Sequence, residues 1–407
     1  MGKVGEKMST ILERIKKYSH ELYAIREQIH RHPELGNREY RTAELVEKTL
    51  HDLGIETRRV TETAIVGTLT GGRPGPTAAL RADMDALPVS EDSGADFSSE
   101  TAGLMHACGH DVHTTAALGA AMLLAEHRET LPGTVKFFFE PDEEGSGGAA
   151  RMIAAGCMEG VEAVFGAHVA PDLPAGVIGV RYGKFYAASN MFTVIVHGRS
   201  AHGAQPEKGI DALAAAAAMI TELRTLPAKH IQDPAILSIG MIRAGTAGNI
   251  IADKAEFSGI MRTLGPEDRE KLKTVFEKTI RQISDAFGTT TEIRITESYA
   301  GIVNSEAETR HVQKTAEALF GAENVRVLAQ PTMTTEDFGC FIDAAKGSFF
   351  HIGAGCTAPL HNPKFLPEPL TIIRLAALHA DIIEQYLFKD QVSGFRNNRF
   401  PPYGTEK

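Results

Sequence analysis

The stretch that most strongly indicates the fold and chemistry of this 407-residue chain is Leu104–His113, which reads LMHACGHDVH. Cys108 and His110 alternate, so an extended backbone points both side chains to one side, and Gly109 between them allows a close approach. We expect Asp111 to cap a helix, because the next residues, 112–127, are rich in Ala and Leu and predict a buried helix. A thiol and imidazoles at this spacing indicate a metal site more often than a disulfide.

Two predicted strands, at residues 78–83 and 134–139, end in acidic side chains. Residues 64–69 and 78–83 are separated by a Gly/Pro-rich turn, which predicts a hairpin or two adjacent strands. The second of them runs into Asp83 and Asp85, where ligands usually bind in an α/β sheet. A turn aspartate that caps a loop is the alternative interpretation of either residue.

The other strand, residues 134–139, ends in EPDEEG at positions 140–145, which places four acids in five positions. Adjacent carboxylates repel, so their clustering suits a bound cation or a carboxyl kept protonated for acid/base work. A solvated acidic loop is the alternative. Residues 145–150 also match the weak dinucleotide pattern G-x-G-x-x-G/A, but the neighbouring acids oppose a pyrophosphate, and we interpret the glycines as the turn into a helix at 149–155.

Further along, His168 ends an apolar strand at residues 164–169. A single histidine there is either structural or a ligand, and its position at a strand end makes it a candidate for the same site. The alternation of strands and helices from residue 307 onward continues the α/β pattern, and an apolar helix is predicted at 370–387. We expect the tail from Lys389 to be poorly ordered.

The pattern changes between residues 187 and 299. Strands at 191–196, 235–242, 255–262 and 291–298 alternate with helices at 209–226 and 266–287. The order β-α-β-β-α-β is that of a ferredoxin-like module. The predicted organisation is therefore a larger α/β domain made of residues 1–186 and 300–407, with an inserted ferredoxin-like domain at 187–299.

Composition narrows the classes of partner and location. The formal net charge of -10, without a long basic cluster, argues against nucleic acid or an anionic membrane as a partner. The longest apolar run, residues 213–220, is far shorter than the roughly 20 residues that span a bilayer. The four cysteines are sparse, the N-terminus has no apolar signal segment, and a cytoplasmic location is expected.

Four motifs together resemble the M20 family of metallo-aminoacylases and carboxypeptidases, in particular the branch of hippurate hydrolases, N-acyl-amino-acid amidohydrolases and auxin-conjugate hydrolases. The motifs are MHACGHD at 105–111, EEG at 143–145, GAHV at 166–169 and LHNP at 360–363. The resemblance covers nearly the whole chain. It implies an α/β/α catalytic domain of zinc-exopeptidase type, with the inserted module as a lid.

The resemblance also implies roles for individual residues. Two divalent metals (Mn, Zn, Co or Ni) would be bound by Cys108, His110, Glu144, His168 and His361. Glu143 would be the general base and acid, and His202 in the inserted module would contact the substrate, in dimers from the neighbouring subunit. Asn249 and Arg262 match positions that hold a substrate carboxylate, and we expect them to grip it together. The implied enzyme is an amidohydrolase of N-acyl-L-amino acids or short dipeptides, assembled as a homodimer or homotetramer through the lid.

One residue departs from this pattern, and several alternatives remain. Glu140 stands where the branch often has Gln, which adds an acid near the site and affects the expected metal preference and pH optimum. A metallo-carboxypeptidase or dipeptidase of the same fold is the nearest alternative function. A cysteine hydrolase using Cys108, a dinucleotide-binding oxidoreductase and a non-catalytic binding protein are more distant ones.

Overall fold

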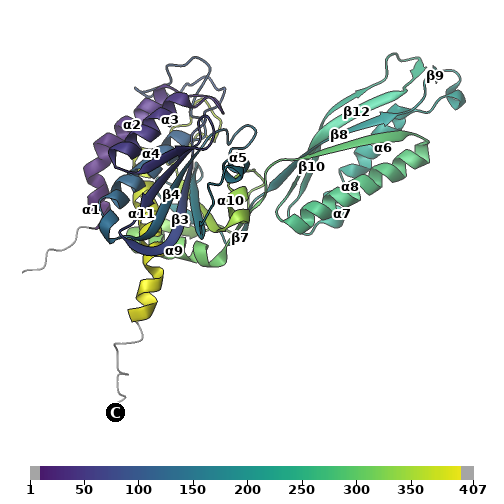
Figure 1. Ribbon diagram of the computed structural model, residues 1–407. Helices are drawn as coiled ribbons and strands as arrows, with labels where there is room; N and C mark the ends of the chain where they lie inside the picture. The colour runs from purple at the N-terminus through teal and green to yellow at the C-terminus, as the bar shows by residue number, and fades with distance from the viewer. Residues whose placement is uncertain (1–9, 396–407) are drawn as a thin grey trace, which may run out of the picture. The chain divides into compact units, whose positions relative to one another are not determined.

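The computed structural model describes residues 10–395, with side chains up to 389, and its described residues divide into two compact units (Figure 1). Unit 1 comprises residues 10–181, Asn304–Leu328 and residues 341–395, and unit 2 comprises Tyr182–Val303 and Ala329–Cys340. The predicted boundaries lay at 187 and 300. Residues 329–340 join unit 2 because backbone hydrogen bonds link Thr332 to Phe185 and Ala187 to Thr334.

Unit 1 is built on one mixed eight-stranded sheet. In spatial order its strands are β1 (Glu56–Arg59), β2 (Ile65–Thr70), β4 (Pro132–Glu140), β3 (Arg73–Asp83), β5 (Ala163–Ala170), β16 (Lys346–Gly353), β6 (Ile178–Val180) and β15 (Val325–Val327). The central run β4, β3, β5 and β16 is parallel. The prediction that β2 and β3 form a hairpin or lie next to each other in the sheet is wrong, since β4 lies between them and pairs with both.

Helices cover this sheet and form most of the core of unit 1. They are α1 (Ile11–Ile15), α2 (Ser19–Arg31), α3 (Tyr40–Asp52), α4 (His110–Ala125), α5 (Ala149–Ala154), α9 (Glu306–Phe320) and α11 (Pro369–Phe395), with α10 (Gly339–Ala344) at the boundary of the units. The buried helix predicted at 112–127 is confirmed, because α4 is buried from His110 to Leu124 and packs against α2, α11 and β3. The tail from Lys389 continues as part of α11 to Phe395, and the rest of the tail lies outside the described residues, so the expectation of poor order stays untested.

Unit 2 has the predicted ferredoxin-like topology. Its main elements are β8 (Ala188–His197), α6 (Ala212–Leu223), β10 (Ile236–Ala244), β12 (Lys254–Thr263), α8 (Pro266–Phe287) and β13 (Thr290–Glu297). The strands lie in the order β10-β12-β8-β13, and each neighbouring pair is antiparallel. Phe192, Phe257 and Phe276 join α6 and α8 to one face of the sheet. Smaller elements are β7 (Gly183–Tyr186) paired with β14 (Ile302–Asn304), β9 (Ala201–His202) paired with β11 (Ile250–Ile251), and α7 (Leu226–His230).

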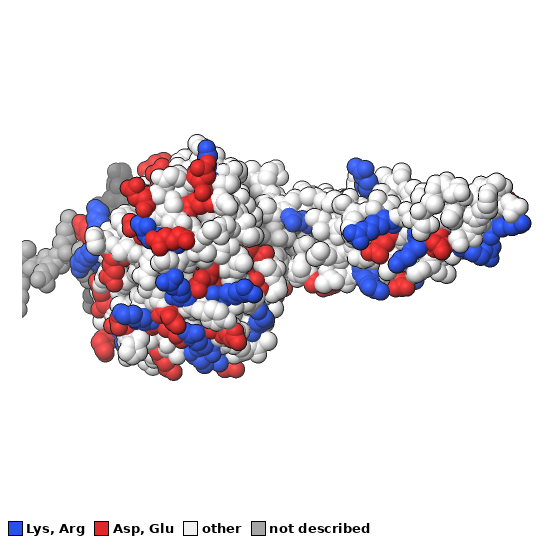
Figure 2. Space-filling model, turned by 90° about the horizontal axis from the view of Figure 1, so that it is seen from above, with Lys and Arg blue, Asp and Glu red and all other residues white. Residues whose placement is uncertain are grey.

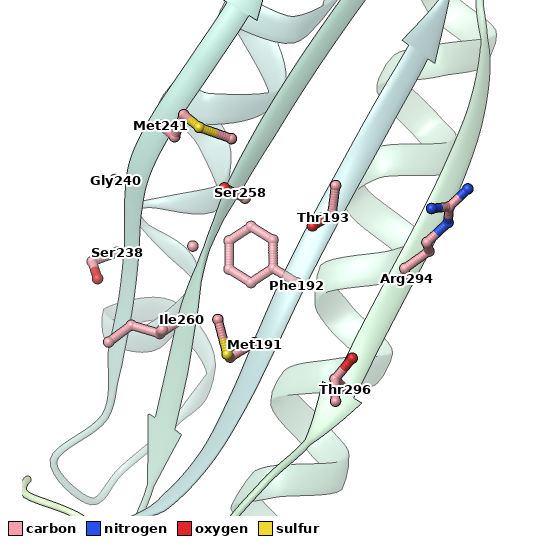
Figure 3. A pocket seen from close by; sticks show the side chains of 11 residues that line it. Met191, Phe192, Thr193, Ser238, Gly240, Met241, Ser258, Ile260, Arg294 and Thr296 are labelled. Carbon is pink, nitrogen blue, oxygen red and sulfur yellow. The ribbon is translucent and has the colours of Figure 1, made fainter. Parts of the chain in front are cut away.

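The other face of the unit 2 sheet carries an open hollow of about 570 Å³ (Figure 3). Met191, Thr193, Ser258 and Ile260 line it from the two central strands, with Arg294 at one side. None of the candidate site residues lines this hollow, so the chemistry predicted from the sequence lies elsewhere.

The charged surface gives no indication of a polyanion partner on the face that Figure 2 presents. Basic and acidic side chains are interspersed over each unit there. Within residues 10–395, no helix is long and apolar enough to cross a bilayer.

Candidate metal centre

The loop before α4 brings the first two candidate ligands together. Gly109 is the N-cap of α4 and adopts φ +86°, where a Cβ would also collide with Val169. Glycine tolerates this left-handed conformation, which turns the chain sharply between Cys108 and His110. The predicted N-cap, Asp111, instead lies in the first turn, where its buried carboxylate accepts hydrogen bonds from Arg26 and His30.

His110 is oriented by a carboxylate on its far side. Its Nδ1 donates to Oδ1 of Asp85 at 3.0 Å, and Oδ2 of Asp85 accepts the backbone N–H of Glu144 at 3.0 Å. The buried Nε2 of His110 has no hydrogen-bond partner among the described residues and lies 3.7 Å from Asp83 Oδ2. A histidine held by a carboxylate at one nitrogen while the other is available has the usual arrangement of a metal ligand.

His168 has the same kind of orientation. Its Nδ1 donates to the carbonyl oxygen of Val169 at 2.8 Å, which directs Nε2 to a point 3.4 Å from Cys108 Sγ. Burial, together with the nearby His113, lowers the pKa of His168 well below its usual value, so its ring is neutral. Neutral imidazole is the form that binds metals.

Glu144 and His361 complete the cluster from two other segments. His361 Nε2 lies 2.9 Å from Glu144 Oε1. The backbone N–H of His361 donates to the carbonyl oxygen of Ala107 at 2.8 Å, so the loop that carries His361 is tied to the loop that carries Cys108. His361 itself adopts φ +62°, which is unusual for a residue with a side chain.

The five predicted ligands and Glu143 therefore occupy one place in unit 1. Overlapping groups of three have ligand atoms within 4.8 Å of one another: Cys108, His110 and His168; Cys108, Glu144 and His361; and His110, Glu143 and Glu144. Cys108, His110, Glu143 and His168 are buried, whereas Glu144 is partly exposed and His361 more so. A buried set of sulfur, nitrogen and oxygen donors suits transition-metal ions.

The electrostatics of the cluster also fit a cation. Burial and the nearby Glu144 and Glu143 carboxylates raise the pKa of the Cys108 thiol well above its usual value. Burial alone would raise the pKa of Glu144, but its bond to His361 and the charge of His110 lower it to about 2. Burial disfavours protonated His110, yet Asp83 and Asp85 raise its pKa to about 10. A divalent cation would replace these protons and reverse the preference of Cys108, because a coordinated thiol is deprotonated.

Two further residues, Asp83 and His113, form another group with His110 whose ligand atoms lie within 4.8 Å of one another. His113 Nδ1 donates to Asp83 Oδ1 at 2.6 Å, and its Nε2 accepts the backbone N–H of Val169 at 2.9 Å. Both ring nitrogens are therefore engaged, and His113 supports Asp83 and β5. The sequence placed Asp83 and Asp85 at a strand end but gave no role to either. The i, i+3 spacing of His110 and His113 on one helix was the signal available for His113.

Glu140, the departure noted in the sequence, does not add an uncompensated acid. Its Oε2 accepts from Arg81 Nε at 2.5 Å, and Arg81 Nη1 donates to Asp83 Oδ2 at 2.7 Å. All three side chains are fully buried. Arg81 therefore shares its positive charge between Glu140 and Asp83, and the expected effect of Glu140 on metal preference and pH optimum stays a prediction.

The candidate substrate residues of unit 2 are not brought together within one chain. His202 and Asn249 lie close, because β9 pairs with β11 and Gly203 donates to the carbonyl oxygen of Asn249. Arg262 lies near the opposite end of β12, eight residues beyond Lys254, which is roughly 26 Å along a strand. Asn249 and Arg262 of one chain are therefore too far apart to hold the same carboxylate, and their joint contact with a substrate stays a prediction that would need residues of two subunits.

Fold and cluster together define a class: a metal-binding α/β protein with an inserted ferredoxin-like unit. Residues 79–385 match Peptidase family M20/M25/M40, and the chain belongs to this family. It is 38% identical to "Thermostable carboxypeptidase 1" of Saccharolobus solfataricus over 87% of this chain and 92% of the relative. It is 36% identical to the "N-acyl-L-amino acid amidohydrolase" of Geobacillus stearothermophilus over 75% and 83%.

A solved structure agrees in fold. The Bacillus subtilis YXEP protein, described as a dinuclear metal binding peptidase from the M20 family, superposes with a TM-score of 0.83 at 32% identity, covering 91% of this chain and 99% of that one. The predicted family and the α/β fold are confirmed.

Proposed function

We propose that this protein is a metal-dependent amidohydrolase that cleaves N-acyl-L-amino acids, or short dipeptides, with a free carboxylate. The observation that carries the proposal is the buried cluster in which Glu143 lies beside the candidate ligands His110 and Glu144. The relatives named as an amidohydrolase and as a dinuclear peptidase support the same reaction class.

Two divalent ions, of Mn, Zn, Co or Ni, would be held by Cys108, His110, Glu144, His168 and His361. When bound, such ions polarise the scissile carbonyl and make water more acidic. The chain supplies their orientation, because Asp85 and the Val169 carbonyl hold the far nitrogens of His110 and His168.

Glu143 is the proposed proton carrier. It is buried and directly precedes Glu144 on the turn after β4. Its carboxylate accepts a proton from the attacking water and delivers it to the nitrogen of the leaving amine, so that the amide C–N bond breaks. Burial favours this role, since a carboxylate shielded from bulk water exchanges its proton with the substrate and not with solvent.

His202, Asn249 and Arg262 are the proposed substrate contacts of unit 2. The Nδ1 of His202 accepts the backbone N–H of Ala204 at 3.0 Å, so the neutral ring carries its proton on Nε2, where it can donate to a developing oxyanion. Arg262 suits a carboxylate. Since His202 and Arg262 lie far apart in one chain, we propose that a site uses Arg262 of one subunit with His202 and Asn249 of its partner.

This arrangement requires at least a homodimer, which we propose forms through unit 2. Exposed apolar side chains on β8, β10 and β11 support self-association: Met191, Ile236, Met241, Ile242 and Ile250. Sparse cysteines and the small-molecule substrate agree with a cytoplasmic location.

Two alternative functions fit the residues of this site unequally well. A metallo-carboxypeptidase would use the same cluster, and the Saccharolobus solfataricus relative bears that name. A cysteine hydrolase fits poorly, because the thiol of Cys108 is buried and its raised pKa disfavours the nucleophilic thiolate.

The test is a substrate panel assayed with added Mn(II) or Zn(II). We expect cleavage of N-acyl amino acids and little cleavage of their C-terminal amides. Preference for longer peptides with a free C-terminus would favour the carboxypeptidase. Equal cleavage of acids and amides would contradict the carboxylate contact.

A further inference from the structure

Asp142 stands out in unit 1 because it combines a left-handed backbone with a crowded, buried carboxylate. Its φ is +61°, a region that costs energy for residues other than glycine. Such conformations persist only where the surroundings hold them, and they cluster at functional sites. Asp142 directly precedes Glu143 and Glu144, so its backbone sets the direction in which both side chains leave the turn after β4.

One oxygen of Asp142 collects donors from three residues. Oδ2 accepts from Asn37 Nδ2 at 2.6 Å, Ser146 Oγ at 2.5 Å, Ser146 N at 3.1 Å and Arg151 Nη2 at 3.1 Å. The bond from Ser146 closes the turn on itself, Arg151 ties it to α5, and Asn37 ties it to the loop before α3. A carboxylate is suited to this position because it only accepts hydrogen bonds.

The backbone of Asp142 is held by a second buried acid, Glu39. Oε1 of Glu39 accepts the N–H of Asp142 at 2.9 Å and the N–H of Asn37 at 3.0 Å. Its Oε2 accepts from Thr63 Oγ1 at 2.8 Å. Glu39 is fully buried, so this link between the two loops is shielded from water.

Two glycines leave the space that this arrangement needs. A Cβ on Gly36 or on Gly145 would collide with Oδ1 of Asp142. Gly145, the first glycine of the dinucleotide-like pattern at residues 145–150, is therefore explained by local packing, because it leaves space for the carboxylate of Asp142.

We propose that Asp142 is a positioning residue, which fixes Glu143 and Glu144 by tying their turn to the loop at residues 36–39. The inference rests on the proposed function, because it acts through the proposed base and a proposed ligand. Loss of the tie lets the turn relax, and a displacement of about 1 Å at a catalytic group costs about 10²-fold. Groups that support metal ligands typically change metal affinity or activity by about 10–100-fold.

The experiment compares Asp142→Ala, Asp142→Asn and the control Asp52→Asn, which changes an exposed acid paired with Lys48 on α3. Metal affinity of the apoprotein is measured by calorimetry with Zn(II) and Mn(II), and kcat and KM are measured at saturating metal. For Asp142→Ala we expect about tenfold weaker affinity for at least one ion, kcat lowered about tenfold or more, and KM within about threefold. Asp142→Asn, which keeps one acceptor oxygen, should recover part of kcat, and Asp52→Asn should match the wild type.

An unchanged kcat at saturating metal in folded Asp142→Ala overturns the proposal, whatever the affinity. If that variant does not fold, Ser146→Ala combined with Arg151→Met removes donors and keeps Asp142, and kcat should fall about threefold or more. A normal kcat in this double variant overturns the proposal equally. If the wild-type protein cleaves no N-acyl amino acid with either metal, the proposed function is wrong and this inference is wrong with it. If the wild type is active and the variants are unaffected, only the inference about Asp142 is wrong.

Discussion

The candidate groups of unit 1 and unit 2 are held in opposite ways. In unit 1, His110 and His168 are buried, and each has one nitrogen fixed by a hydrogen bond. In unit 2, His202 is exposed on a two-residue strand and lies far from Arg262. The side chains of the candidate metal centre are therefore preorganised, whereas the proposed substrate contacts of unit 2 are incomplete within one chain. This difference predicts which changes abolish the reaction and which alter substrate use.

Removal of metal should have the largest effect, because five side chains of unit 1 with donors that suit transition-metal ions converge on one place. Activity should fall to background in EDTA and return on addition of Mn(II), Zn(II) or Co(II). The measurement is hydrolysis of an N-acyl amino acid before and after dialysis. If protein shown to be free of metal keeps full activity, the proposed metal-dependent mechanism is wrong.

Glu143→Gln should come next, with activity lowered about 10²–10⁴-fold, because the amide cannot carry the proton. Metal content, measured by elemental analysis, should stay near that of the wild type. Glu159→Gln, at an exposed turn of the same unit, is the matched control and should be fully active. If Glu143→Gln keeps more than a tenth of the activity, its role is wrong.

The variant His202→Ala tests the proposed substrate contacts of unit 2, which are incomplete within one chain. We expect kcat to fall about 10²–10³-fold, as when one oxyanion donor is lost. Mixing this variant with Glu143→Ala protein should restore part of the activity, since one site of the mixed dimer receives both intact residues. Absence of rescue in mixed dimers would place His202 in the site of its own subunit or outside the mechanism.

Arg262→Lys should have a smaller effect that depends on the substrate. The lysine keeps the charge and loses the paired donors, and loss of such a charge-assisted contact costs about 1.5–3 kcal/mol. We expect kcat/KM for free acids to fall about 10- to 150-fold, with little change for amides. Arg294→Lys, on the exposed side of β13, is the control. An equal loss for acids and amides would mean that Arg262 acts through its bond to the Met333 carbonyl.

The smallest effect concerns the stability of unit 1. Burial favours neutral His30, but Asp111 and Glu91 raise its pKa to about 9, above the unfolded value of about 6.5. Protonated His30 therefore stabilises the fold fully below pH 6.5, and this stabilisation is lost as pH rises to 9. Each kcal/mol of unfolding free energy that is lost lowers Tm by about 2–4 °C in chains of 150–250 residues, and by less in this longer chain.

The Tm of the metal-free wild type should therefore fall between pH 6 and pH 9. This fall should be smaller in His30→Gln, whereas His20→Gln, which changes an exposed residue of α2, should show the same fall as the wild type.

Local patterns predicted most helices and strands well, because these depend on neighbours in the sequence, whereas the ligand set came from the family resemblance and stays a prediction. The helix predicted at 266–287 is α8, and the motif residues converge as the resemblance implied. The position of β4 between β2 and β3 could not be predicted, since strand order depends on contacts far apart in the chain. The same holds for Asp142, whose partners Asn37 and Glu39 precede it by about a hundred residues.

The separation of Asn249 from Arg262 differs from these cases, because β12 runs between the two residues and its length sets their distance. The strand predicted at 255–262 therefore already implied this separation. Asp85 could be located at a strand end, but its bond to His110 requires the loop before α4 to fold back over β3.

The position of β16 between β5 and β6 bears on when the proposed metal site can be completed during synthesis. Residues 182–303 leave the ribosome before β16, so unit 2 can fold while the sheet of unit 1 still lacks this strand. His361 follows β16 and is the last ligand to be made. A nascent chain therefore carries Cys108, His110, Glu144 and His168 for the time needed to add nearly two hundred residues, about 10–40 s at typical elongation rates. The proposed metal site is therefore completed late in synthesis, after the strand that closes this part of the sheet.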